Sequence, residues 1–457
     1  MDITGSKNTD ITGKIRDLLP LFFSVLLMSF STYLLLLIEK LLLARVSKEV
    51  MEIAVNSAYV SQIFQAPCVA LAMMAQVYVG RWIGGQNYKS IGPGIWQFIW
   101  FSVLSTLATL PIGWVGSSLY FQNTLLGSEA ITYSRFLIAI GFLYPLGATL
   151  SCFYLGQGKT LLVVIATIGS QLVKLISAYL LIFGWGNLIP GLGLMGGVIS
   201  TLIAQGGLCL FLLVTFLSKK NRTLFDTHRW RLKLKLFWDC IQPGLLRAMN
   251  RILSFTCWVF IARLASSKGA DYLLSLSIGG SLFLFLPFLG DALCQAQTTV
   301  VSQILGAQNY IYLKKALRSA AFIVTIMIVV VGIPLIVFPS AAFDLLFPTI
   351  QLTTPEIQTM FLGIWLSFAF FTFGYLPVSY VLAFKDTGFS FFMGFVAWIN
   401  GFLFMYLMME KASIRADFFW IAISIMHFSN LVFYWMRMRT LQARILRTHS
   451  LNHLQTS

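Results

Sequence analysis

The sequence has few charged residues for its length. Only 11% of its 457 residues are Asp, Glu, Lys or Arg, whereas soluble domains contain about 25%. This is too little charge to cover the surfaces of several soluble domains, so that architecture is excluded. Hydrophobic residues make up 58% of the chain and the mean hydropathy is +0.82, as is typical of a protein embedded in a membrane.

Residues that build metal sites, disulfides and catalytic centres are also scarce. The chain has four histidines and six cysteines, without CxxC pairing. The cysteines lie in or beside apolar stretches, which favours free, buried thiols. No cluster of His, Asp and Glu lies within these stretches, so we expect no metal, no resident cofactor and no enzyme activity. The six residues are Cys68, Cys152, Cys209, Cys240, Cys257 and Cys294.

A complete nucleotide-binding loop is missing as well. Gly156-Gln-Gly-Lys-Thr160 resembles the end of the motif GxxxxGKS/T, whose backbone amides bind phosphates. Phe153, however, stands where that motif requires its first glycine. ATP is therefore not an expected ligand.

Long apolar stretches are abundant. A helix needs about 20 mostly apolar residues to cross about 30 Å of hydrocarbon, and twelve stretches of the sequence meet this requirement. We therefore predict an all-α polytopic membrane protein with twelve transmembrane helices. The stretches lie near residues 18–38, 54–80, 94–116, 133–155, 160–183, 193–217, 238–262, 272–304, 317–338, 358–384, 388–409 and 416–438.

The basic residues are distributed unevenly between the connecting segments. The chain has 32 Lys and Arg against 16 Asp and Glu, and most of the cations fall on one side if the connections alternate across the membrane. The positive-inside rule then places both termini in the cytoplasm, and we expect a plasma (inner) membrane protein. The basic linker 218–235 is most simply a topology signal that lies against anionic lipid. Membrane lipids, and not nucleic acid, are the expected partners.

Short motifs recur in the same order in both halves of the chain. Gly-Gly-Gln-Asn-Tyr at 84–88 returns as Gly-Ala-Gln-Asn-Tyr at 306–310, and Gly158-Lys159-Thr160 aligns with Lys385-Asp386-Thr387. The spacing between matches is 218 to 227 residues, which indicates an internal duplication. Further matches are Pro20 with Pro243, Ala44-Arg45 with Ala262-Arg263, Pro67 with Pro287, and Ala75-Gln76 with Ala296-Gln297.

Six helices in each half is an even number, so both halves enter the membrane from the same side. Such repeats are related by an axis along the membrane normal and bind substrate at their interface. We predict two pseudo-symmetric six-helix bundles that face a central cavity. The predicted parts are a cytoplasmic segment (1–17), the first bundle (18–217), a basic linker (218–235), the second bundle (236–439) and a cytoplasmic tail (440–457).

Several of these motifs resemble those of multidrug and toxic compound extrusion (MATE) transporters. They are Gly-Gly-Gln-Asn at 84–87, the run Tyr179-Leu-Leu-Ile-Phe-Gly184 followed by Pro190-Gly-Leu-Gly193, and the turns at Lys159-Thr160 and Asp386-Thr387. The resemblance extends from Pro20 to about residue 439. It implies a V-shaped pair of bundles and an antiporter that exports an organic compound, driven by H⁺ or, less favoured, Na⁺. We expect it to act as a monomer.

Charges within the apolar stretches mark the candidate site, because each costs about 2.5–3.5 kcal/mol at a helix centre. Glu39 lies where the first helix of the MATE family has the acidic residue implicated in ion coupling. Aligned on the Leu-Leu-Ile-Phe-Gly run, Lys174 and Ala178 occupy the positions at which one branch of the family has Asn and Asp cation ligands. An ammonium at this position argues against a Na⁺ site of that kind. It leaves proton coupling through a Glu39–Lys174 pair or a shift to anionic cargo, with a snorkelling lysine as the structural alternative.

Arg247 and Arg251 share one face of the seventh predicted helix with Asn250 beside them. Guanidinium groups bind carboxylate or phosphate well, so we predict that these residues line the substrate cavity. Asp291 lies one turn beyond Pro287, with Gln295 and Thr298 on the same face, and is a third candidate for ion coupling. Its alternative role is a salt bridge to either arginine.

The remaining polar residues within the spans are weaker candidates. Gln62, Gln171 and Gln205 can line the cavity or form interhelical hydrogen bonds, and a structural role is favoured for His427. Two transport functions stay open. The first is export of an organic compound against H⁺. The second keeps the same fold but moves an anionic metabolite or a lipid-linked precursor, as the cavity arginines suggest by resemblance to the lipid II flippases of the same superfamily.

Overall fold

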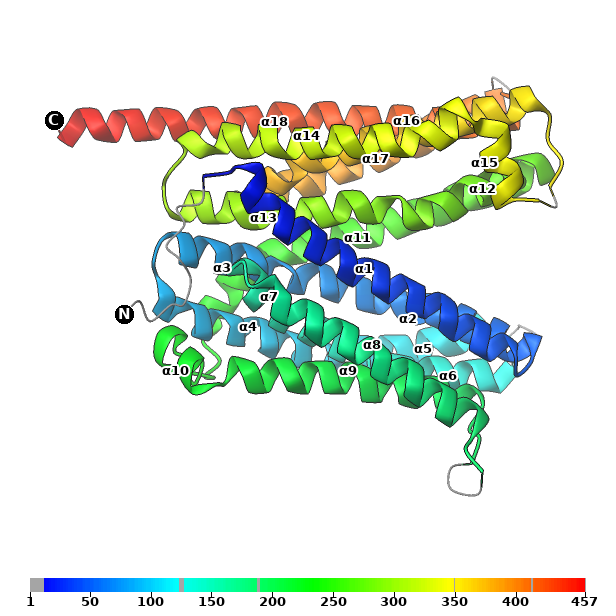
Figure 1. The fold of residues 1–457 in the computed structure, drawn as a ribbon, viewed down its shortest axis with the longest axis horizontal. Helices are drawn as coiled ribbons and strands as arrows, with labels where there is room; N and C mark the ends of the chain where they lie inside the picture. The colour runs from blue at the N-terminus through cyan, green and yellow to red at the C-terminus, as the bar shows by residue number, and fades with distance from the viewer. Residues whose placement is uncertain (1–11, 123–126, 187–189, 349, 412–413, 457) are drawn as a thin grey trace. The chain divides into compact units, whose positions relative to one another are not determined.

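A computed structural model describes residues 12–122, 127–186, 190–348, 350–411 and 414–456, and nearly all of this part of the chain is helical (Figure 1). Eleven helical segments in it are long and apolar enough to cross a membrane. A twelfth forms if the segments Ala270–Phe283 and Pro287–Gly306, bent by 41° against each other, are one span. The chain is an integral multi-pass membrane protein, and the predicted all-helical architecture is confirmed.

The helices follow the predicted stretches closely. Three of the spans in the first half are broken into two helices, and a short helix, α10, lies within the predicted linker. The first half consists of α1 (Ile15–Ala44), α2 (Lys48–Ala72), α3 (Met74–Gly84), η1 (Tyr88–Ser90), α4 (Ile91–Leu104), α5 (Thr106–Phe121), α6 (Gly127–Ala139), α7 (Leu143–Gly156), α8 (Thr160–Phe183), α9 (Leu194–Phe216) and α10 (Lys219–Phe225).

In the second half the pattern is similar, with longer uninterrupted helices. It consists of α11 (Leu234–Lys268), α12 (Ala270–Phe285), α13 (Pro287–Gly306), α14 (Ile311–Gly332), η2 (Ile333–Val337), α15 (Pro339–Leu346), α16 (Thr354–Ala383), α17 (Thr387–Tyr406), η3 (Leu407–Lys411), η4 (Ala416–Phe418) and α18 (Phe419–Thr456).

The chain forms two compact units. The N-terminal unit comprises residues 23–252, and the C-terminal unit comprises residues 1–22 and 253–457. Each division falls within a helix, the first in α1 and the second in α11. Both of these helices therefore contribute residues to both units.

Local sequence signals explain where several helices begin. Ser47 precedes α2, and its hydroxyl accepts a hydrogen bond from the amide of Val50 at 3.1 Å. At the start of α16, the carboxylate of Glu356 accepts from the amide of Thr353 at 2.9 Å, and Pro355 stands in the first turn. Such caps satisfy backbone groups that have no partner within the helix.

The duplicated motifs form the same turns in both halves. Gln86 and Gln308 end α3 and α13 with φ of 55° and 56°. The next residue closes the helix in both cases: the amide of Asn87 donates to the carbonyl of Trp82 at 2.8 Å, and that of Asn309 to Ile304 at 3.2 Å. This is the hydrogen bond of a Schellman cap. Each repeat thus encodes one specific helix ending, which supports the duplication.

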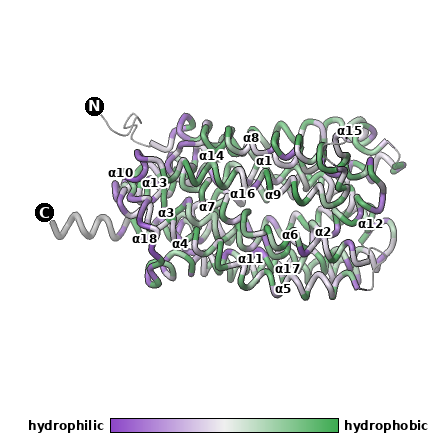
Figure 2. The backbone as a smooth tube through the Cα atoms, turned by 90° about the horizontal axis from the view of Figure 1, so that it is seen from below, coloured by the Kyte–Doolittle hydropathy of each residue, from purple (hydrophilic) through white to green (hydrophobic). Residues whose placement is uncertain are grey.

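Each unit has its own apolar core. In the N-terminal unit, residues of α1, α2, α5, α6, α8 and α9 surround the buried Tyr133 and Ala178. In the C-terminal unit the core contains Trp420, Phe343 and Phe361, all nearly inaccessible. Large apolar side chains also face outward from many helices, as lipid-facing surfaces require. Figure 2 shows hydrophilic residues gathered around α10, whereas α8 and α9 are mostly apolar.

Candidate ion-coupling site

Glu39 of α1 and Lys174 of α8 form an ion pair in the N-terminal unit. The ammonium Nζ of Lys174 donates to Oε2 of Glu39 at 2.6 Å. Only 12% of the lysine side chain and 14% of the glutamate side chain are exposed. Lys174 therefore points at the carboxylate and does not snorkel toward a membrane surface.

Two tyrosines and one glycine lie close to this pair. The charge of Glu39 acts on the phenols of Tyr133 in α6 and Tyr144 in α7, and the charge of Lys174 acts on Tyr144. A Cβ on Gly197 of α9 would lie 3.3 Å from the Tyr133 hydroxyl oxygen and 3.7 Å from Oε1 of Glu39. Five helices thus meet around one pair of opposite charges. The sequence analysis did not predict Tyr133, Tyr144 or Gly197 as site residues.

A second polar contact links the same two helices nearby. Nε2 of Gln171 in α8 donates to Oγ1 of Thr32 in α1 at 3.3 Å. Because Gln171 precedes Lys174 by three residues, the two side chains lie on the same side of α8. This contact fixes α8 against α1 and so positions the ion pair. The next turn of α8 presents Ala178, which is 2% exposed within the apolar core.

The other two glutamines differ from each other. Nε2 of Gln205 in α9 donates to the carbonyl of Leu143 at 3.3 Å, which is an interhelical hydrogen bond of the expected kind. Gln62 in α2 is exposed. Among the described residues, neither glutamine forms a hydrogen bond with Glu39 or Lys174.

The basic face of α11 lies beside a different part of the N-terminal unit. Nη1 of the half-buried Arg247 contacts Sδ of Met74 at 3.8 Å, and its charge acts on Cys152. Cys152 follows Tyr144 by eight residues on α7, about 12 Å along that helix. Arg251 is exposed. The arginines and the ion pair are therefore not a single cluster.

Asn250 has an unusual environment beside these arginines. Its Oδ1 is buried, and no described residue donates a hydrogen bond to it. A buried amide oxygen without a donor is costly, by about 1–3 kcal/mol. An ordered water or a ligand group that donates a hydrogen bond there would remove this cost. The role of Asn250 in substrate binding stays a prediction.

The remaining candidates lie in the C-terminal unit. Asp291 and Gln295 are half-buried on α13, and Oγ1 of Thr298 donates to the carbonyl of Cys294 at 2.7 Å. His427 is 7% exposed and lies with its ring centroid 5.1 Å from that of Phe371 and 6.2 Å from that of Phe283. The imidazole is thus packed among aromatic rings. The role of Asp291 in coupling and that of Gln295 in the substrate cavity stay predictions.

A cavity within the N-terminal unit lies at the ends of α2, α6 and α9. Its volume is about 410 Å³. None of the predicted site residues lines it, although Thr132 is the neighbour of Tyr133 in α6. The lining residues are Val50, Ser128, Glu129, Thr132, Leu192, Leu194 and Met195.

Known proteins resemble this chain in structure but not in sequence. No protein-family model matches the sequence, and no curated protein matches it. Solved structures of MATE and MOP superfamily transporters match nearly the whole chain. A MATE transporter in a bent conformation has a TM-score of 0.84 and 14% identity, and covers 97% of this chain and 100% of its own.

Two further structures resemble the chain to the same degree. A multidrug resistance MATE family transporter in an outward-facing conformation has a TM-score of 0.83 and 14% identity, with 96% of this chain and 99% of its own covered. A MOP superfamily transporter from Pyrococcus furiosus has a TM-score of 0.82 and 15% identity, with 96% and 99% covered. Its binding pocket is described as having reverse polarity, which suggests a different function. The fold of the present chain is thus that of MATE transporters, as the resemblance of its motifs predicts.

Proposed function

We propose that this protein is a secondary active transporter that exports an organic compound in exchange for protons by alternating access. Its fold is that of known transporters, which supports transport in general. The observation that favours proton coupling is the nearly buried Glu39–Lys174 pair. It places one carboxylate that can be protonated in a site from which water is largely excluded.

The energetics of the pair explain how a proton can drive a conformational change. Protonation of Glu39 removes the negative charge and leaves the ammonium of Lys174 without its counter-charge. A single unpaired charge left behind by a broken buried pair costs about 3–5 kcal/mol. A conformation in which Lys174 reaches water or another partner is then favoured. Proton binding therefore shifts the equilibrium between conformations that differ in the exposure of Lys174.

Sodium is the less favoured coupling ion. A Na⁺ site needs several oxygen ligands, and the ammonium of Lys174 already occupies the space beside Glu39. Ala178 one turn further on supplies no oxygen from its side chain. The Lys174 ammonium acts as a fixed cation that competes with any other cation for the carboxylate.

Transport assays on reconstituted protein can test the role of Glu39. In proteoliposomes with an imposed pH gradient, we expect Glu39→Gln to abolish substrate movement driven by the gradient. Glu52→Gln is the matched control, because Glu52 pairs with Lys48 at 3.7 Å on the exposed surface of α2, with 84% of Lys48 and 42% of Glu52 exposed. The control should transport like the wild type. Equal transport by Glu39→Gln and wild type at every pH would disprove proton coupling through this carboxylate.

Export or flipping of an anionic compound is the second candidate. It is favoured by the exposed Arg251 on α11, with Arg247 one turn away. A transporter of this fold from Pyrococcus furiosus is described as having a binding pocket of reverse polarity, so pocket charge varies among proteins of this fold. Under this second proposal, Arg251→Glu should abolish uptake of fluorescent anions and leave uptake of fluorescent cations intact. The opposite pattern would favour cationic cargo.

Further proposals concern the cellular context. We propose that the protein acts as a monomer in the plasma (inner) membrane, with both termini in the cytoplasm and without ATP or any enzyme activity. The excess of basic residues in the connections on one side supports this orientation. Accessibility of a tag at each terminus to an impermeant reagent in intact cells would test it.

A further inference from the structure

The segment that follows α10 is held against α4 by hydrogen bonds to its backbone. Nε1 of Trp96 donates to the carbonyl of Thr227 at 2.7 Å, and Nε1 of Trp100 donates to the carbonyl of Trp230 at 2.8 Å. The buried amide of Gln97 binds the same segment twice: it donates to the carbonyl of Arg231 at 3.2 Å and accepts from the amide of Lys233 at 3.1 Å. We call residues 226–235 the basic segment.

The start of the basic segment is fixed equally firmly. Oδ1 of the buried Asp226 accepts from Nζ of Lys89 at 3.1 Å, and its Oδ2 lies 3.2 Å from Nε of Arg229. Asp226 has a φ of 54°, a left-handed conformation that Asp tolerates better than most residues. Gly92 of α4 allows this approach, because a Cβ there would lie only 2.4 Å from the carbonyl oxygen of Phe225. The basic segment is therefore an ordered part of the N-terminal unit.

Basic and large apolar residues alternate along this segment. Positions 229, 231, 233 and 235 are Arg, Arg, Lys and Lys, while positions 230, 232 and 234 are Trp, Leu and Leu. All seven side chains are exposed; the exposed fraction is 59% for Trp230, 41% for Leu232 and 76% for Leu234. A topology signal requires only the charges. The exposed apolar side chains at every second position need a separate explanation.

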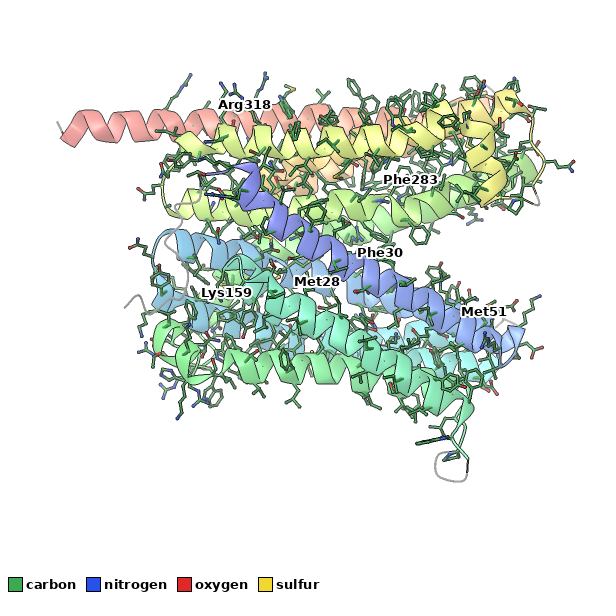
Figure 3. All side chains as sticks on the ribbon, viewed as in Figure 1. Met28, Phe30, Met51, Lys159, Phe283 and Arg318 are labelled. Carbon is green, nitrogen blue, oxygen red and sulfur yellow. The ribbon has the colours of Figure 1, made fainter. Side chains whose placement is uncertain are left out.

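Most of these cations have no carboxylate to neutralise them. Asp226 already binds Lys89 and Arg229. In the part of the chain that the structure describes, no Asp or Glu lies within 4.0 Å of Arg231, Lys233 or Lys235. Lys159 (labelled in Figure 3), at the start of α8, adds more positive charge beside the beginning of this segment, since its Nζ lies 5.9 Å from the ring centroid of Phe225. An anionic partner would satisfy this surface.

The position of the segment identifies that partner. The basic segment follows the span α9, which ends at Phe216, and its last two residues are the first two of the span α11, which begins at Leu234. It therefore lies at the boundary of the membrane. Trp side chains favour this interfacial depth, and Trp230 lies with its ring centroid 6.3 Å from that of Trp100. We propose that the basic segment is a binding surface for anionic phospholipids: Arg231, Lys233 and Lys235 bind the headgroup phosphates, and Trp230, Leu232 and Leu234 enter the interface.

The hydrogen bonds of α4 make this proposal easy to test. They bind backbone atoms, so substitution of the exposed side chains leaves the anchoring intact. The test variant is Arg231→Gln/Lys233→Gln/Lys235→Gln in the full-length protein. Its matched control is Lys314→Gln/Lys315→Gln/Arg318→Gln, which removes three exposed cations from α14 (Arg318 is labelled in Figure 3) and changes the net charge equally.

The measurement is lipid retention. Each purified protein is incubated with equal amounts of phosphatidylglycerol and phosphatidylcholine in detergent, free lipid is removed, and the bound lipids are counted by mass spectrometry. We expect the wild type and the control to prefer phosphatidylglycerol, and the test variant to lose that preference by at least about tenfold, since each interfacial cation contributes about fivefold. An equal preference in test variant and wild type, or an equal loss in the control, would overturn the proposal.

Two further arms separate a membrane surface from a site for free anions. Inorganic phosphate and chloride, compared at equal ionic strength, should reduce lipid retention to the same extent, because only screening acts. Stronger competition by phosphate would identify a soluble-anion site and overturn the proposal. Trp230→Ser/Leu232→Ser should lower the retention of phosphatidylglycerol although no charge changes. Unchanged retention in this variant would refute the role of the apolar side chains.

Discussion

The contact between α1 and α8 in the N-terminal unit and that between α11 and α17 in the C-terminal unit occupy corresponding places in the duplication. In the second contact, the ring centroids of Trp258 and Trp398 lie 6.1 Å apart. The spacing of 218 residues that aligns Ala44 with Ala262 places Cys257 opposite Glu39. The spacing of 227 residues that aligns Gly158 with Lys385 places Gly401 opposite Lys174. The N-terminal unit thus has a carboxylate where the C-terminal unit has the thiol of Cys257. It has an ammonium where the C-terminal unit has Gly401, which lacks a side chain.

The C-terminal unit fills its interior with aromatic side chains. Trp420 is fully buried, its ring centroid lies 4.8 Å from that of Phe283 and 6.4 Å from that of Trp258, and its Nε1 donates to the carbonyl of Ser275 at 2.9 Å. A Cβ on Gly279 would overlap the indole of Trp420. The two halves have thus kept the same turns but hold their helices together differently. One interior holds an ion pair, and the other is closely packed with aromatic rings.

The largest expected effect concerns the charged interior. Lys174→Met should lower the free energy of unfolding by about 3–5 kcal/mol, because it leaves the carboxylate of Glu39 nearly buried without its partner. Glu39→Gln/Lys174→Met should recover most of that loss, since no charge then remains. Thermal or denaturant unfolding in one detergent, followed by intrinsic fluorescence, measures both.

The C-terminal unit offers the control for this prediction. Lys268 and Glu410 lie 2.7 Å apart with 26% and 33% of their side chains exposed, so water screens them more strongly. Glu410→Gln should cost about 1 kcal/mol or less. An equal cost for Lys174→Met and Glu410→Gln would show that the interior of the N-terminal unit is no less hydrated than the surface of the other unit.

A smaller effect is expected in the aromatic interior. Trp420→Phe should destabilise the protein by about 2 kcal/mol, through loss of the hydrogen bond to Ser275 and of part of the buried ring. Trp398→Phe serves as the control, because Trp398 is half-buried and its indole nitrogen has no hydrogen bond among the described residues. The same unfolding assay compares them. A smaller cost for Trp420→Phe than for Trp398→Phe would contradict the central place of Trp420.

How far the sequence predicts these interiors depends on the type of residue. Glu39 and Lys174 stand out because charges are rare in apolar spans. The sequence allows them to pair, but it equally allows a snorkelling lysine, and the structure decides between the two. Tyr133, Tyr144 and Gly197 do not stand out, because tyrosine and glycine are common in such spans. Their convergence depends on how five helices pack, which no spacing along the chain reveals.

The positions of the helices were also predicted only in part. The first predicted span, 18–38, lies within α1, and the twelve-span count agrees with the structure when the bent α12–α13 pair is one span. The break at Met73 was not predicted, because hydropathy is uniform across it. The contacts that hold residues 226–235 against α4 were not predicted either, since indole-to-carbonyl hydrogen bonds leave no periodic signal in the sequence.

The duplicated turns provide a prediction of about 1 kcal/mol. Gly158 and Lys385 occupy the same left-handed position, with φ of 79° and 61°. Gly158→Ala should destabilise by about 1 kcal/mol, because a Cβ is disfavoured at positive φ although nothing lies within 4 Å of it. Lys385→Gly relieves the same strain in the second half and should be neutral or slightly stabilising. Unfolding of each variant against the wild type gives the difference.

Gly169 within α8 provides a control for the Gly158 variant. Substitution there lowers the flexibility of the unfolded chain without backbone strain in the folded protein. A Cβ on Gly169 would also have nothing within 4 Å, and the φ of this residue is not positive. Gly169→Ala should therefore stabilise the protein by up to about 1 kcal/mol. If Gly158→Ala stabilised it as well, the turn at Gly158 would not be left-handed in the protein.

The smallest effect should be that of His427, which tests whether the C-terminal interior is only packed. Nε2 of His427 is buried and has no hydrogen-bond partner among the described residues, while Phe283 and Phe371 flank the ring. His427→Phe keeps the aromatic contacts and removes an unsatisfied polar atom, so the free energy of unfolding should change by less than about 1 kcal/mol. Transport driven by a pH gradient should also persist. Loss of that transport with unchanged stability would place His427 on the proton path. Both interiors would then contain a group that binds a proton, and the contrast between an ion pair in one and aromatic packing in the other would not hold.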